Sequence, residues 1–329
     1  MAKVLVTGGA GYIGSHTVKA LGRAGHEVAV LDDLSEGHRA AIRSVPIHEG
    51  NVGDRAFVDA VLAAERPDAV VHFAAHCYVG ESVTAPGKYW RNNAVATLSL
   101  LEALIGANAP VFLFSSTCAV YGEPKRGLLR EDLPRLPVNP YGRTKAAVEW
   151  MLEDFHRAHG LRYASLRYFN AAGADPEGDL GEDHDPETHL VPLVIREALR
   201  GEGSLRVFGT DYPTPDGTCV RDYVHVTDLA DAHVRAVGRL LSGGEPVRVN
   251  LGTGRGHSVL EVIRAVSERA GRPVPYAVVE RRPGDPARLV ARPGRARTAL
   301  GWRPRHSGLP ELVDTAWRWH EAHPEGYGE

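Results

Sequence analysis

The sequence predicts an α/β protein, in which a doubly wound parallel sheet is followed by a smaller C-terminal α/β region. Three observations support this prediction. Short β-branched runs alternate with longer helical patterns through the first half of the chain. A glycine-rich turn follows the first such run. The length of 329 residues exceeds a domain of about 150 residues, which favours two units.

The expected elements of the first half alternate regularly between strand and helix. In chain order they are a strand over Lys3 to Thr7, a helix over Ile13 to Ala24, a strand over Glu27 to Leu31, a helix over Asp54 to Glu65, a strand over Ala69 to Ala75, a helix over Lys88 to Ala107, a strand over Val111 to Ser115, a helix over Tyr141 to Ala158 and a strand over Tyr163 to Tyr168. The third strand is almost entirely apolar, as expected where both faces of a sheet are covered.

A second region is expected after Asn170, where the composition shifts to Gly, Pro and Asp between Ala174 and Pro186. The predicted units are therefore residues 1–173 and 174–329. The run Val247 to Leu251 has the pattern of another sheet strand, so we expect segments near 220–255 to return to the first unit.

Composition and charge exclude several function classes. The chain is 43% hydrophobic and 24% charged, which is typical of a globular protein. A net charge of −3 provides no field that would attract nucleic acid or an anionic membrane. The sequence shows neither a signal-peptide pattern nor an apolar run of about 18 residues, so we expect a cytoplasmic protein.

The cysteines predict neither a disulfide framework nor a metal site. Cys77, Cys118 and Cys219 are odd in number and lack C-x-x-C spacing. We therefore expect reduced thiols and no bound metal.

A dinucleotide site is predicted where the first strand meets the first helix. Gly8, Gly11 and Gly14 have G-x-x-G-x-x-G spacing, and glycine lets the backbone turn tightly and approach a pyrophosphate at a helix N-terminus. Asp32 and Asp33 end the second strand, roughly 20 residues on, where an acid accepts a hydrogen bond from the adenosine ribose. A carboxylate there repels a 2′-phosphate. The sequence thus predicts a Rossmann-type domain that binds NAD rather than NADP.

A candidate catalytic group follows from two further patterns. Ser115-Ser116-Thr117 closes a strand, and ligands bind at the carboxyl ends of strands in such sheets. Tyr141 and Lys145 form Y-x-x-x-K, which places both side chains on one helix face. We expect Thr117 to hold a substrate hydroxyl and Tyr141, as a phenolate stabilised by the Lys145 ammonium, to take its proton. Y-x-x-x-K alone is an ordinary helix pattern, and its combination with the glycine loop favours catalysis.

The motifs together resemble the extended short-chain dehydrogenase/reductase superfamily and, within it, the UDP-glucose 4-epimerase family. The matching segments run nearly end to end: TGGAGYIGSH (7–16), VGESV (79–83), VYGE (120–123), NPYGRTK (139–145), RYFNAAGA (167–174), THLVP (188–192), VFGTDYPTPDGTCVRDYVHVTDLADAH (207–233), NLGTG (250–254) and RRPGDPA (281–287). The resemblance implies NAD-dependent inversion of C4 in a UDP-hexose such as UDP-glucose or UDP-galactose, through a 4-keto intermediate. It also implies a homodimer formed by the helices near residues 88–107 and 141–158.

The resemblance assigns roles residue by residue. Catalysis falls to Thr117, Tyr141 and Lys145. The cofactor-binding positions are Gly8, Gly11, Tyr12, Ile13, Gly14, Asp32, Asp33, Asn51, Val52, Phe73, Ala74, Ala75, Asn92, Tyr141, Lys145 and Tyr168. The substrate-binding positions are Thr117, Asn170, His189, Leu190, Phe208, Arg221, Arg282, Asp285 and Leu289.

The physical chemistry of the substrate positions agrees with these roles. Arg221 and Arg282 each offer a planar fork for a diphosphate, and Phe208 is suited to cover a uracil face. The resemblance further implies that Leu289 falls on a position that controls access of a C2 N-acetyl group.

Four positions depart from the family pattern. Cys77 replaces a lysine near the NAD phosphates and nicotinamide, and its loss bears on cofactor retention and redox poise. Asn51 replaces an aspartate that meets adenine but still offers a carbonyl acceptor. Arg292 replaces an acid near the sugar pocket, and Thr117 replaces a serine while keeping the hydroxyl.

Several alternatives remain open. A UDP-glucuronate 4-epimerase would need polar partners for its carboxylate, which Cys118 and Ala119 do not supply but the region of Arg292 offers. A UDP-N-acetylglucosamine 4-epimerase depends on the space at Leu289. A 4,6-dehydratase would carry acids after Thr117, where this chain has Cys118 and Ala119. A non-catalytic NAD sensor would not need the intact Thr117, Tyr141 and Lys145.

Overall fold

The computed structural model describes residues 1–43, 45–109, 111–123, 127–201, 203–282 and 285–328. The elements of the first half are β1 (Lys3–Thr7), α1 (Tyr12–Arg23), β2 (Glu27–Asp32), η1 (Arg39–Ala41), β3 (Ile47–Glu49), α2 (Arg55–Glu65), β4 (Ala69–His72), α3 (Val79–Thr84), α4 (Pro86–Tyr89), η2 (Trp90–Val95), α5 (Ala96–Gly106), β5 (Val111–Thr117), η3 (Cys118–Tyr121), α6 (Pro140–His159), β6 (Arg162–Tyr168) and β7 (Asn170–Ala172). The second half contains α7 (Leu190–Arg200), β8 (Arg206–Phe208), β9 (Val220–Arg221), β10 (Tyr223–His225), α8 (Val226–Leu241), β11 (Val247–Leu251), β12 (His257–Ser258), α9 (Val259–Ala270), β13 (Ala277–Val279), β14 (Arg288–Leu289), α10 (Gly294–Leu300) and α11 (Leu309–Ala322).

The predicted doubly wound sheet is confirmed. Within the described residues it has seven strands in the order β11-β6-β5-β4-β1-β2-β3, and every pairing is parallel. The chain runs outward from β1 through β2 and β3 on one side, and from β4 through β5 and β6 on the other. Such a reversal between β1 and β4 opens a crevice at the carboxyl edge, where ligands bind in these sheets.

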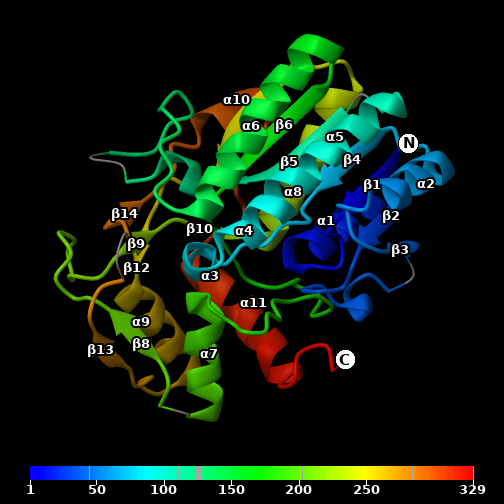
Figure 1. Cartoon of the computed structure of the whole chain (residues 1–329). Helices are drawn as coiled ribbons and strands as arrows, with labels where there is room; N and C mark the ends of the chain where they lie inside the picture. Colours follow the sequence, from blue (N-terminus) through cyan, green and yellow to red (C-terminus); the bar gives the residue numbers. More distant parts are fainter. Residues whose placement is uncertain (44, 110, 124–126, 202, 283–284, 329) are drawn as a thin grey trace.

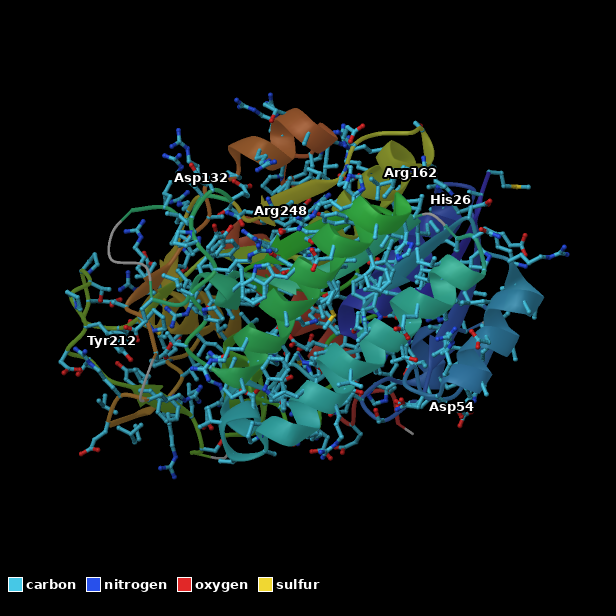
Figure 2. All side chains as sticks on the ribbon, turned by 45° about the horizontal axis from the view of Figure 1, so that its top comes forward. His26, Asp54, Asp132, Arg162, Tyr212 and Arg248 are labelled. Carbon is cyan, nitrogen blue, oxygen red and sulfur yellow. The ribbon has the colours of Figure 1, made fainter. Side chains whose placement is uncertain are left out.

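Helices cover both faces of the sheet (Figure 1). On one face α1 and α8 pack their apolar sides, including Leu21 and Leu229, against the strands. On the other face α2, α5 and α6 do the same through residues such as Leu62, Leu100 and Leu152. Side chains fill the space between these layers (Figure 2). Among the helices described, none is long and apolar enough to cross a membrane.

Most of the expected elements differ from the structure by one or two residues at an end, and two of them differ more. The expected helix over Lys88 to Ala107 consists of α4, the π-helix η2 and α5. The expected strand over Ala69 to Ala75 pairs with its neighbours only as far as His72. Residues 73–75 therefore leave the sheet at its carboxyl edge, beside the glycine loop.

The second region lies at the carboxyl edge of the main sheet, where α7, α9 and α11 share an apolar cluster (Figure 1). The same region contains short sheets with the strand orders β10-β7, β12-β9-β14 and β13-β8. In contrast, β11 joins the main sheet beside β6, and α8 packs on its face, although both follow residue 174. The two regions thus exchange segments.

Candidate active site

The glycine loop between β1 and α1 requires glycine for steric reasons. Gly8 has a φ of +69°, and a Cβ there would lie 2.4 Å from the backbone nitrogen of Ala74. A Cβ on Gly14 would lie 2.1 Å from the carbonyl oxygen of Gly8, so only glycine allows α1 to approach the loop this closely. The N-cap residue Gly11 has no side chain to bond the first N–H groups of α1. These groups are therefore available to an anion.

Asp32 supports this loop directly. Its carboxylate accepts hydrogen bonds from the backbone N–H of Ala10 at 2.8 Å and of Leu34 at 2.9 Å. Burial raises the pKa of Asp32, and these two bonds oppose part of that rise. Asp32 thus fixes the loop and lies at the carboxyl end of β2, where a ribose acceptor is expected.

Asp33 and Asn51 form a pair beside Asp32. The Asn51 Nδ2 donates to Asp33 at 2.7 Å, and its Oδ1 accepts from the N–H of Gly53 at 2.8 Å. The carbonyl predicted to face adenine therefore already has one partner, and its second lone pair remains for another donor.

The other predicted cofactor residues surround the same edge of the sheet. The Tyr12 hydroxyl donates to the carbonyl of Gly173 at 2.6 Å, which ties the loop to the chain after β7. The Tyr168 hydroxyl lies 2.6 Å from Nε2 of His233, and the ring of Phe73 is tilted by 43° against the same imidazole, with the ring centroids 4.8 Å apart. The remaining predicted positions occupy the neighbouring ends and turns: Ile13 in α1, Val52 after β3, Ala74 and Ala75 after β4, and Asn92 in η2.

The candidate catalytic residues converge at the carboxyl end of β5. Thr117 is 8% exposed and its hydroxyl accepts from the N–H of Ala119 at 3.1 Å. The Thr117 hydroxyl lies close enough to Tyr141 to influence the pKa of its phenol. The Lys145 ammonium donates to the carbonyl of Ser115 at 2.9 Å and lies 5.9 Å from the centroid of the Tyr141 ring. β5 and α6 thus bring together the three residues that the sequence singles out.

Burial controls the protonation of this group. It raises the pKa of Tyr141 well above its ordinary value, and the neighbouring Thr117 hydroxyl offsets part of that rise. Burial also lowers the pKa of Lys145 to about 8. Cys77 is exposed, yet its thiol is close enough to raise the pKa of both residues. A phenolate at Tyr141 therefore needs positive charge beyond what the protein alone supplies.

The predicted substrate arginines each have a partner in the structure. The guanidinium of Arg221 forms an ion pair with Asp285, and Leu289 pairs with Arg221 across β14 and β9. The guanidinium carbon of Arg282 lies 3.8 Å from the centroid of the Phe208 ring. Arg282 therefore covers one face of the ring that is predicted to meet uracil.

The remaining substrate positions lie on both sides of the crevice. The N–H of Asn170 donates to the carbonyl of Asp222 at 2.9 Å. Leu190 begins α7, and the imidazole of His189 turns toward carboxylates rather than standing free. Leu289 packs on an apolar cluster that includes Cys118 and Phe169, which places it near the end of β5.

The sequence analysis did not predict a buried polar network that lies beneath the catalytic group. Glu149 is fully buried and accepts from Ser116 Oγ at 2.7 Å and from Arg167 Nε at 2.8 Å. Arg167 also donates to the Tyr121 hydroxyl at 2.8 Å, which in turn donates to Asn250 at 2.6 Å. Glu149 follows Lys145 by one helical turn, and this spacing is the only local feature of the sequence that indicates a place for Glu149 beneath the catalytic group. The network fixes β5 and α6 relative to each other.

Comparison with known proteins places this geometry in a family. The chain is 52% identical over 317 residues to a UDP-glucose 4-epimerase of Rhizobium leguminosarum bv. trifolii, covering 96% of this chain and 97% of the relative. It is 47% identical over 324 residues to a UDP-glucose 4-epimerase of Halalkalibacterium halodurans, covering 98% and 97%.

Solved structures agree with these relatives. The UDP-glucose 4-epimerase from Brucella ovis in complex with NAD has a TM-score of 0.94 and 50% identity, covering 96% of this chain and 98% of that one. The enzyme from Bifidobacterium longum in complex with NAD+ and UDP has a TM-score of 0.94 and 39% identity, covering 98% and 99%. The sequence model of the family described as "NAD dependent epimerase/dehydratase family" matches residues 4–252. With this match, and with relatives that are similar over nearly their whole length, the chain belongs to the NAD dependent epimerase/dehydratase family.

Proposed function

We propose that this protein is an NAD-dependent enzyme that inverts C4 of a UDP-hexose, with UDP-glucose and UDP-galactose as its main substrates. The observation that carries the proposal is the meeting of Thr117, at the carboxyl end of β5, with Tyr141 and the buried Lys145 on α6. Relatives named UDP-glucose 4-epimerase, which match over nearly the full length, support the same activity.

The residues present fit NAD at the glycine loop. Gly8 and Gly14 leave no room for a Cβ, and the N-cap residue Gly11 leaves the first N–H groups of α1 without a side-chain partner. Asp32 and Asp33 end β2 with carboxylates, which favour a free ribose hydroxyl over a phosphate. NAD bound there would take up hydride from C4 and return it to the opposite face, so that no second redox substrate is consumed.

The protein's own part in the reaction is proton transfer and orientation. Thr117 would hold the C4 hydroxyl, and Tyr141 would take its proton as hydride leaves C4, giving the 4-keto sugar. Tyr141 would return the proton after the sugar has presented its other face. Because Lys145 has a pKa lowered to about 8 by burial, it remains mostly protonated near pH 7 and can stabilise the phenolate.

The protein would hold the substrate through its nucleotide and diphosphate rather than through the hexose. The hexose has to rotate in the site so that its other face can receive hydride. Arg221 and Arg282 would grip the diphosphate. Arg221 retains further guanidinium donors while it is paired with Asp285. Phe208 offers the face opposite Arg282 to uracil. Asn170, His189 and Leu190 would line the same side.

We also propose a cytoplasmic homodimer, with units dividing near residue 173. Trp90 is 41% exposed in η2 and Trp150 is 46% exposed in α6, and these two helices pack against each other. Large exposed apolar side chains on neighbouring elements are typical of an interface. The free cysteines fit a reducing compartment.

The activity is tested with a panel of UDP-sugars incubated without added cofactor, with products separated by C4 configuration. We expect UDP-glucose and UDP-galactose to interconvert. Conversion of UDP-glucuronate alone, or formation of a 4-keto-6-deoxy product, would replace the proposal by a related activity. Absence of turnover with added NAD would favour a sensor.

A further inference from the structure

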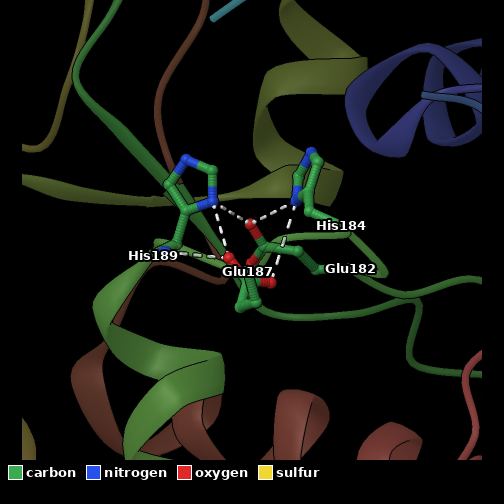
Figure 3. A group of neighbouring side chains, drawn as sticks. All are labelled: Glu182, His184, Glu187 and His189. Atoms are coloured by element: carbon green, nitrogen blue, oxygen red, sulfur yellow. Dashed lines mark hydrogen bonds and ion pairs between the residues drawn. The ribbon is translucent and has the colours of Figure 1, made fainter. Parts of the chain in front are cut away.

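A compact group of side chains lies in the segment before α7, and of its members only His189 is also an expected substrate position. It consists of Glu182, His184, Glu187 and His189, whose candidate ligand atoms all lie within 4.8 Å of one another (Figure 3). The Nδ1 atom of His189 is 2.9 Å from Glu182 and 3.0 Å from Glu187. The Nδ1 atom of His184 is 3.3 Å from Glu182 and 3.8 Å from Glu187. Both imidazoles thus direct the same type of nitrogen toward both carboxylates.

The group contains polar atoms that no protein hydrogen bond satisfies. The Glu187 side chain is 1% exposed, and its Oε2 has no hydrogen-bond partner within the described residues. The Nδ1 of His184 is also buried without one there. Meanwhile the Oε1 of Glu187 accepts from the N–H of Thr188 at 2.7 Å and of His189 at 2.8 Å, which fixes the carboxylate in place. An unpartnered buried carboxylate oxygen costs free energy, and a bound cation removes that cost.

We propose that Glu182, His184, Glu187 and His189 bind one divalent metal ion of the zinc type as a closed structural site. Two imidazole nitrogens and two carboxylate oxygens are ligands that Zn²⁺ accepts in tetrahedral geometry. With metal–ligand bonds of about 2.0–2.2 Å, neighbouring ligand atoms of a tetrahedron lie about 3.3–3.6 Å apart. The nitrogen–oxygen separations of 2.9–3.8 Å, which involve both oxygens of Glu187, lie around this range, and one ligand atom from each residue lies within 4.8 Å of the others.

The electrostatics favour a cation at this place. The carboxylates of Glu182 and Glu187 are 5% and 1% exposed, so both are buried beside the two imidazoles. Two carboxylates with two neutral imidazoles carry the charge that a divalent ion balances.

The position links the site to both halves of the crevice. The ring of Tyr12, in the NAD-binding loop, lies 6.2 Å from the ring of His184. Leu190, which begins α7, directly follows His189. A bound ion would therefore hold the segment between the cofactor loop and α7 in one conformation.

The test measures metal content and metal binding on the full-length protein. Protein stripped with a chelator is incubated with Zn²⁺ or Mg²⁺, desalted, and analysed by inductively coupled plasma mass spectrometry. We expect about one equivalent of Zn²⁺ per chain and no retained Mg²⁺, and a thermal midpoint that rises with Zn²⁺ alone. Failure of the wild-type protein to retain Zn²⁺ would show that the group is an ion-pair network of protonated histidines.

A matched pair of variants locates the site. Glu187→Gln should lose Zn²⁺ retention at least tenfold. Glu177→Gln removes a carboxylate of another acidic group, in which Lys19 already pairs with Glu177 and Asp179 at 2.9 and 3.1 Å, and it should retain Zn²⁺ fully. Equal retention in both variants would overturn the assignment.

A spectroscopic measurement does not depend on the folding of any variant. The wild-type protein loaded with Co²⁺ should show the intense visible bands of tetrahedral coordination. Weak octahedral bands would contradict the proposed ligand set, whichever variants fold.

Discussion

Replacing Glu149 by glutamine should destabilise the protein strongly, because the change leaves the charge of Arg167 buried and unpaired. Glu149 is fully buried and Arg167 is 1% exposed, and two nitrogens of the guanidinium donate to the carboxylate. Breaking a buried ion pair by removing one partner costs about 3–5 kcal/mol. For 329 residues, about 2.1 cal/mol/K per residue gives an unfolding entropy of about 0.7 kcal/mol/K. The thermal midpoint should therefore fall by about 4–7 °C.

The control is Asp154→Asn on the same helix. Asp154 pairs with Arg157 at 2.8 Å, but both side chains are more than 70% exposed, at 72% and 73%. Such a pair contributes about 0–1 kcal/mol, so its loss should shift the midpoint by about 1.4 °C or less. Both variants are compared by differential scanning calorimetry at one scan rate. Similar small shifts in both would refute the reasoning.

The same pair predicts a pH dependence. Burial alone would raise the pKa of Glu149, but the hydrogen bonds and charge of Arg167 and the bond from Ser116 lower it overall. A carboxyl whose folded pKa is depressed stabilises the fold fully above its unfolded pKa of about 4.3, and this contribution is lost as the pH falls through the folded value. The midpoint difference between wild type and Glu149→Gln should therefore be constant near neutral pH and shrink below about pH 4.3. A difference that grows on acidification would show the opposite linkage.

The remaining predictions concern the reaction and the assembly. Tyr141→Phe should lower kcat by at least about a hundredfold, the usual contribution of a general base, while NAD binding measured by calorimetry is unchanged; near-normal turnover would exclude the proposed base. Lys145→Ala should move the pKa of the kcat profile upward, since the phenolate loses its ammonium, and an unshifted profile would contradict that role. Leu289→Tyr should suppress UDP-N-acetylglucosamine turnover by about ten- to a hundredfold relative to UDP-glucose, whereas equal losses would place Leu289 outside the C2 pocket. Trp150→Glu should convert a dimer into a monomer in sedimentation at micromolar concentration, and a monomeric wild type would rule out the proposed interface.

The sequence determined the elements of the sheet and the types of residue at its carboxyl edge. Strand and helix periods, the glycine spacing and Asp32 are local signals, and steric and hydrogen-bonding rules act on them over a few residues. Thr117 and the Tyr141–Lys145 pair were found in the same way. Thr117 lies at the end of a strand, and Tyr141 and Lys145 share one helix face. These positions follow from the sequence within a few residues. Even here the π-helix at Trp90–Val95 was not predicted, because a wide helical turn leaves the apolar pattern unchanged.

Only the tertiary structure decided which side chains meet. Arg221 pairs with Asp285 and Glu149 with Arg167, and Arg282 covers the ring of Phe208. None of these contacts has a signal in the spacing of the residues, because each depends on how the strands and returning segments are ordered in space. The protonation states of the site residues also could not be predicted from the sequence. The pKa of Lys145 is lowered to about 8 because packing removes water from the ammonium, and the degree of burial is a property of the folded chain.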